Sequence, residues 1–120
     1  MAHINLIVIK TDKLKEQFEF YSALGIEFHY HRHGNGPYHY ASVAGNPTIE
    51  IYPLPKSILQ PDNSTRLGIS VENLDTLIQE LKSRDITIIS EPLQTEWGYS
   101  AVIQDLDGQK IELTEAETKS

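Results

Sequence analysis

Short apolar stretches alternate with polar turns along the chain, and their spacing predicts both strands and helices. Alternating apolar and polar positions are typical of half-buried strands, whereas apolar positions three and four residues apart are typical of helices. The helical pattern occurs twice, from about Asp12 to Leu24 and from about Asn73 to Arg84, and each first residue is a candidate N-cap. The expected strands cover residues 3–9, 26–33, 38–44, 48–52, 66–71, 86–89, 97–104 and 110–114.

The two halves of the chain repeat one pattern, β-α-β-β-β, which predicts two similar modules within one domain of residues 1–120. Module one covers about residues 1–52 and module two about residues 66–115. A linker of about residues 53–65, which contains three prolines, joins them. His3 and Arg66 match at a separation of 63 residues, and Glu50 and Glu112 match at 62. The repeat predicts packing of the modules about a local two-fold axis.

Alternation also assigns a face to each strand side chain. In the last strand it directs Ile111 and Leu113 toward the helix, which leaves Glu112 on the opposite face. The same rule directs Ile49 and Ile51 inward in the matching strand of module one, and it places Glu50 and Tyr52 on the opposite face. In the first strand of each module, the apolar sets expected inward are Ile4, Leu6 and Val8, and Leu67, Ile69 and Val71. The residues expected to face away from the helices at corresponding strands are His3, Glu50, Arg66 and Glu112.

Composition narrows the class of protein further. Of the 120 residues, 39% are hydrophobic and 22% are charged, as in an ordinary soluble globular domain. The net charge of −7 disfavours nucleic acid and anionic membranes as partners, because both require a basic face. The sequence has no cysteine, and we expect neither a signal peptide nor a membrane-spanning segment. These features predict a cytoplasmic protein.

Several segments together resemble the vicinal oxygen chelate superfamily, which includes glyoxalase I, bleomycin-resistance proteins and extradiol dioxygenases. The segments that carry the resemblance are His3, Phe20–Gly25, Glu50 within TIEIYP, Arg66–Val71, HGNGPYHYA and DLDGQKIEL. The resemblance covers nearly the whole chain. It implies an α+β fold of two βαβββ modules, with curled mixed sheets around a cup and helices on the outer face. It also implies a homodimer.

The resemblance further implies one divalent metal ion, held in such proteins by two histidines and two glutamates. Carried over by position, the ligands are His3, Glu50 and Glu112, and Arg66 stands where the second histidine belongs. A guanidinium stays protonated and has no lone pair for a metal, so metal dependence is in question. Arg66 can instead pair with the two glutamates, or it can anchor an anionic group of a substrate.

Other side chains have two interpretations each. His29, His31 and His33 alternate along one strand, which indicates a solvated face, with metal ligation as the alternative. His39 is either a packed, hydrogen-bonded histidine or a cavity residue that binds substrate. Trp97 is either a core residue or a lid over an apolar ligand, and Tyr52 is a further candidate for substrate binding.

These residues support two functional hypotheses. The first is an enzyme acting on an oxygen-bearing small molecule, a glyoxalase-like lyase or isomerase or a dioxygenase relative. Under this hypothesis, Glu50 or Glu112 is the catalytic general base, and a metal or Arg66 stabilises the developing oxyanion. The second is a non-catalytic protein that binds and sequesters a drug, an antibiotic or another small molecule. A domain that serves only in assembly is a weaker third hypothesis.

Overall fold

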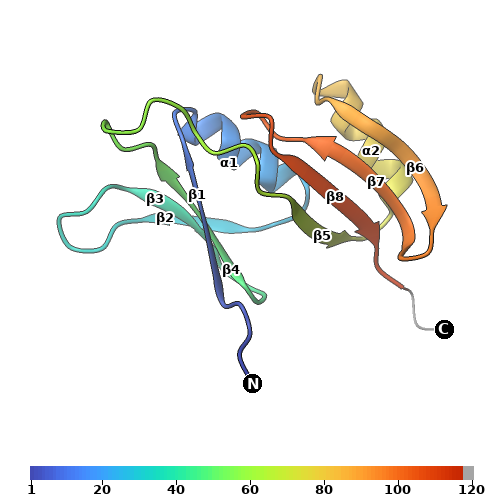
Figure 1. The fold of residues 1–120 in the computed structure, drawn as a ribbon, viewed down its shortest axis with the longest axis horizontal. Helices are drawn as coiled ribbons and strands as arrows, with labels where there is room; N and C mark the ends of the chain where they lie inside the picture. Colours follow the sequence, from blue (N-terminus) through green and yellow to red (C-terminus); the bar gives the residue numbers. More distant parts are fainter. Residues whose placement is uncertain (118–120) are drawn as a thin grey trace. The chain divides into compact units, whose positions relative to one another are not determined.

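Each half of the chain folds into a four-stranded mixed sheet with a helix against one face (Figure 1). The computed structural model describes residues 1–117, and the chain divides into two units, Met1–Asp62 and Asn63–Ser120. Both units have the predicted order β-α-β-β-β, so the α+β class with two βαβββ modules is confirmed. The unit boundary falls within the predicted linker.

The first unit contains β1 (Leu6–Thr11), α1 (Leu14–Ala23), β2 (Phe28–His31), β3 (His39–Ser42) and β4 (Thr48–Pro53). Its sheet has the strand order β1-β4-β3-β2, in which β1 and β4 are parallel and the other pairs are antiparallel. In Figure 1 the blue β1 and the green β4 overlap in the view, and α1 lies beside them. On the helix side of this sheet, Phe18 of α1 stacks on Tyr40 of β3 with ring centroids 3.9 Å apart.

The second unit contains β5 (Leu67–Val71), α2 (Leu74–Ser83), β6 (Ile88–Thr95), β7 (Gly98–Gln104) and β8 (Lys110–Glu115). Its strand order, β5-β8-β7-β6, repeats that of the first unit. The predicted apolar stripe of α2 is confirmed, because Leu74, Leu77, Ile78 and Leu81 are all buried. This stripe packs on the sheet face that carries the fully buried Ile111 and Leu113.

The predicted faces of β1 are wrong by one residue. Ile9 is 6% exposed, whereas Val8 is 42% and Leu6 is 48% exposed. The parallel pairing with β4 places Ile7 beside Ile49 and Ile9 beside Ile51, so these residues share the helix side. The run from Leu6 to Ile9 is apolar throughout, so alternation did not determine its phase. The hydrogen-bonded register with β4 determines which residues of β1 face α1.

This register also corrects the repeat. Ile7 pairs with Ile49 as Leu67 pairs with Ile111, so the residue of the first unit that corresponds to Arg66 is Leu6. His3 lies before β1, is exposed, and has no counterpart in β5. The assignment in β5 and β8 is confirmed, because Leu67 and Val71 are buried and Gly68 pairs with Glu112 on the other face.

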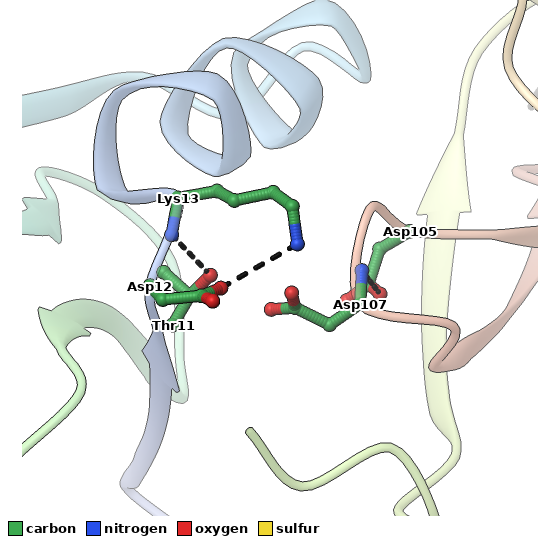
Figure 2. A network of polar contacts seen from close by, with 5 residues as sticks. All are labelled: Thr11, Asp12, Lys13, Asp105 and Asp107. Carbon is green, nitrogen blue, oxygen red and sulfur yellow. Dashed lines mark hydrogen bonds and ion pairs between the residues drawn. The ribbon is translucent and has the colours of Figure 1, made fainter. Parts of the chain in front are cut away.

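Neither helix begins with the predicted side-chain cap. The N-cap of α1 is Lys13 rather than Asp12, and its backbone N–H donates to Thr11 Oγ1 at 3.0 Å (Figure 2). Asp12 instead lies 3.4 Å from Lys13 Nζ. Asn73 is the N-cap of α2 but its side chain makes no capping hydrogen bond, and the Leu74 N–H donates to Glu115 Oε1 at 2.9 Å. The N-terminus of α2 is therefore capped by a carboxylate 41 residues away in the sequence.

Two further boundaries differ around Trp97. β6 was expected to end near residue 89, but it continues through Pro92 to Thr95, with two register shifts against β7. Such shifts let an irregular strand accommodate proline. Trp97 was expected within the next strand and instead lies in the tight turn between β6 and β7. The turn predicted at Asp105–Gly108 is confirmed, since Asp105 Oδ1 accepts from the Asp107 N–H at 3.0 Å (Figure 2).

Candidate functional site

In the first unit, Glu50 lies on the sheet face opposite α1, as predicted. β-Sheet register aligns it with Val8 of β1 and Ala41 of β3, and Ala41 in turn with His29 of β2. The next pair on this face, His31 and His39, are directly opposed across the β2–β3 ladder. Three neighbouring strands therefore bring histidines and one carboxylate to the same face.

His39 is the centre of this group. Its side chain is completely buried, and its ring stacks on Tyr52 with centroids 3.9 Å apart and planes at 11°. Its Nδ1 lies 3.1 Å from the Pro37 carbonyl oxygen, which can only accept a hydrogen bond. Its Nε2 lies 3.5 Å from Glu50 Oε2. The sequence left packing and a cavity role open for His39, and the structure shows a packed, hydrogen-bonded histidine.

His31 and His33 complete the group. His31 Nε2 is 2.9 Å from His39 Nε2, and the rings of His33 and His39 have centroids 5.2 Å apart. One candidate ligand atom from each of His31, His33, His39 and Glu50 lies within 4.8 Å of all the others. Burial, followed by the positive charge that His29, His39 and His33 can carry, lowers the pKa of His31 below 6.5, and this favours neutral imidazole. Burial also raises the pKa of Tyr52, with a further contribution from Glu50.

In the second unit, Glu112 lies on the face opposite α2, as predicted. Arg66 Nε is 3.6 Å from Glu112 Oε2, and both side chains are partly exposed. The two residues line a hollow of about 220 Å³. The other lining residues include Leu93, Ala101, Val102 and Trp97, and Trp97 is 74% exposed. This hollow combines apolar walls, an aromatic ring and an ion pair that remains accessible to solvent.

The surroundings of Glu112 do not suit a metal cation. The guanidinium of Arg66 beside the carboxylate offers no lone pair to a metal, so it cannot act as a ligand. His3 precedes β1 and is exposed, so no strand positions its ring. A metal role for His3 and Glu112 remains a prediction of the family resemblance. Around Glu50, by contrast, three imidazoles supply donors that suit a transition metal.

The contact between His31 and His39 was not predicted from the sequence. The two residues were considered separately, although they flank a hairpin turn and therefore can face each other. The available signal was the distance of each histidine from the Gly34–Pro37 turn. Pairing the hairpin in its correct register would have joined them.

The whole chain is similar to proteins of known fold. The family model for the Glyoxalase/Bleomycin resistance protein/Dioxygenase superfamily matches residues 1–113. The chain therefore belongs to this superfamily, and the resemblance predicted from its sequence is confirmed. No curated protein matches the chain significantly. Within residues 1–117, no helix has the length and apolar character that crossing a membrane requires.

Solved structures show the same fold at low sequence identity. TnmS3, an antibiotic binding protein from Streptomyces sp. CB03234, is 19% identical with a TM-score of 0.76 over 98% of both chains. Glyoxalase I from Leishmania major is 21% identical with a TM-score of 0.72, over 96% of this chain and 87% of that one. The hypothetical protein SA1046 from S. aureus is 18% identical with a TM-score of 0.73, over 97% of this chain and 98% of that one. At these identities the likeness concerns the fold alone.

Proposed function

We propose that this protein binds a small organic compound, an aromatic molecule with a positive charge, in the hollow beside Glu112. The observation that carries the proposal is the largely exposed Trp97, which lines the same hollow as a partly exposed carboxylate, that of Glu112. An exposed indole favours stacking on an aromatic ring, and it attracts cations through its π face. Glu112 supplies the counter-charge for an ammonium group.

The volume of the hollow and the net charge of the protein support this class of ligand. A hollow of about 220 Å³ is smaller than the roughly 300–1,000 Å³ of sites that enclose a drug-sized molecule. It therefore suits one ring with a short substituent. The net charge of −7 raises the local concentration of cations near the surface. Arg66 lies beside the Glu112 carboxylate, so the ligand amine must displace the guanidinium or share Glu112 with it.

An enzyme is the second candidate, and the contact between His39 and Glu50 favours it. A buried imidazole beside a carboxylate is a common arrangement for moving a proton to or from a substrate. Glu50 is then the general base or the group that orients His39, and Tyr52 lines the same face. In the second unit, Glu112 is the corresponding base and Arg66 the cation that stabilises an oxyanion. No step of this hypothesis requires a metal at Glu112.

Fluorescence of the single tryptophan tests the binding proposal. Phenethylamine, an aromatic amine, should change the emission in a saturable manner, whereas phenylacetate should not. Glu112→Gln should weaken phenethylamine binding at least about tenfold, equivalent to about 1.4 kcal/mol. Glu96→Gln is the matched control, because Glu96 is an exposed carboxylate next to Trp97 that does not line the hollow.

Equal binding of amine and acid, or equal affinity of Glu112→Gln and wild type, would exclude Glu112 as the counter-charge. Mass spectrometry of the recovered ligand separates the two candidates, because a binding protein returns it unchanged and an enzyme converts it.

We further propose a cytoplasmic homodimer on the family resemblance. Sedimentation should then give about twice the chain mass of 13.6 kDa.

A further inference from the structure

We infer that His31, His33, His39 and Glu50 form a transition-metal site in the first unit, with Zn²⁺ as the preferred ion. The site shares only Glu50 with the ligand set that the family resemblance implies. It uses no residue of the hollow beside Glu112. It therefore stands independently of the proposed ligand-binding function.

The distances suit a four-coordinate ion. The four candidate donor atoms all lie within 4.8 Å of one another. Ligands about 2.0–2.1 Å from a tetrahedral zinc are separated from each other by about 3.3 Å. The separation of the two Nε2 atoms of His31 and His39 is 2.9 Å, and that of His39 Nε2 and Glu50 Oε2 is 3.5 Å. These values bracket the tetrahedral separation, so small side-chain rotations bring the donors to zinc.

The hydrogen bond of His39 prepares it as a ligand. The Pro37 carbonyl only accepts, so Nδ1 of His39 carries the proton and donates it. Neutral His39 then has its lone pair on Nε2, the atom that faces Glu50 and His31. Metal-binding histidines commonly donate their second ring N–H to a carbonyl in this way. Stacking on Tyr52 fixes the orientation of the ring.

Electrostatics favour a positive centre at this point. The Nε2 lone pair of a fully buried ring faces a carboxylate oxygen, which is unfavourable unless a proton or a cation lies between them. The Nε2–H of His31 can donate into that lone pair. For both rings to present an Nε2 lone pair to zinc, neutral His31 would adopt the tautomer that carries its single ring proton on Nδ1.

The donor set and its accessibility define the class of ion. Three imidazoles and one carboxylate suit Zn²⁺ and its neighbours in the first transition row, whereas Mg²⁺ and Ca²⁺ require oxygen ligands. His39 and Glu50 are positioned by the paired strands β3 and β4. His31 is half-buried, and His33 lies exposed in the turn that follows β2. An ion can therefore reach the two positioned ligands through the two more accessible ones.

Calorimetric titration of ZnCl₂ into untagged, chelator-treated protein tests the site. Wild type should bind one ion per chain, and Co²⁺ should give the visible absorption of a four-coordinate nitrogen-rich site that Zn²⁺ then abolishes. His33→Ala and Glu50→Gln should each weaken zinc binding at least about tenfold. His29→Ala is the matched control, because His29 is an exposed histidine on the same face of β2 outside the four ligands.

Substitution of the buried His39 can prevent folding, so it is not used as a test. His33 is exposed, and His33→Ala therefore tests the site with the core intact. No zinc binding to wild type would overturn the proposal. Equal losses in His29→Ala and His33→Ala would also overturn it, because they indicate unspecific binding to surface histidines. A loss in Glu112→Gln without a loss in His33→Ala would place the ion elsewhere and refute the site. The phenethylamine test is separate, because none of the four proposed zinc ligands lines the hollow beside Glu112, so failure of the zinc site leaves the binding proposal standing.

Discussion

Arg66 Nε lies 3.6 Å from Glu112 Oε2, on the face of the second sheet that points away from α2. The side chains remain 54% and 37% exposed. Ion pairs with this exposure contribute little to stability, because water already solvates both charges well. The pair is therefore expected to contribute little to holding the second unit together.

Replacement of Arg66 tests this expectation. Arg66→Ala should change the free energy of unfolding by less than about 1 kcal/mol. Leu67→Ala, one residue along the strand, should lower it by about 2–4 kcal/mol because Leu67 is 7% exposed and packs in the core. Urea denaturation measures both. If Arg66→Ala lowers the free energy of unfolding as much as Leu67→Ala does, the ion pair is structural.

The phase of β1 gives a second prediction. Ile9→Ala should lower the free energy of unfolding by about 2–4 kcal/mol, because it removes a buried side chain from the helix side of the sheet. Val8→Ala removes an exposed side chain and should cost less than about 1 kcal/mol. Thermal or urea unfolding of the two variants makes the comparison. The reverse order would restore the face assignment that alternation alone predicted.

The start of α2 gives a third prediction. Glu115→Ala removes the carboxylate that accepts from the Leu74 N–H, and it should cost about 1 kcal/mol, as the loss of an N-cap does. Glu117→Ala is a suitable control, since Glu117 is exposed and lies beyond β8. Amide exchange at Leu74 should accelerate in the first variant only. Unchanged exchange would show that the helix start does not depend on this contact.

The hydroxyl of Tyr99 gives a prediction about pH. It donates to Asp75 Oδ1 at 2.6 Å, and this hydrogen bond, with burial and the Asp75 charge, raises the pKa of Tyr99 above its ordinary 10.0. The folded state thus holds this proton more tightly than the unfolded state does. The resulting stabilisation is complete below pH 10.0 and is lost as the pH rises through the folded-state value.

Absorbance titration measures this shift directly. The difference between wild type and Tyr99→Phe should report one phenol that ionises above pH 10.0. Asp75→Asn should move that transition back toward the ordinary value, because it removes the negative charge beside the phenol. A transition of Tyr99 at or below pH 10.0 in wild type would contradict the hydrogen bond to Asp75.

Local patterns determined much of the fold. The stripe from Leu74 to Leu81 predicted α2 because helical spacing places its apolar side chains on one face. The alternation of Ile111, Glu112 and Leu113 predicted the two faces of β8 correctly, because polar and apolar residues alternate strictly there. The turn at Asp105–Gly108 followed from the known preferences of aspartate and glycine.

Where the local pattern was uniform or irregular, the same rules failed. The apolar run of β1 is compatible with either phase, and only its pairing with β4 distinguishes them. Pro92 predicted an end to β6, yet register shifts against β7 allow the strand to continue. The error in β1 also displaced the repeat, so His3 was matched to Arg66 in place of Leu6.

Residue order and short-range periodicity were sufficient to predict the family, the two βαβββ modules and the side of the sheet on which Glu50 and Glu112 lie. Contacts between side chains on different segments required the folded structure. The contact of His39 with Glu50 and the capping of α2 by Glu115 each depend on strand register or on a distant segment. Such contacts arise from long-range pairing of the backbone, which periodicity along the chain does not encode.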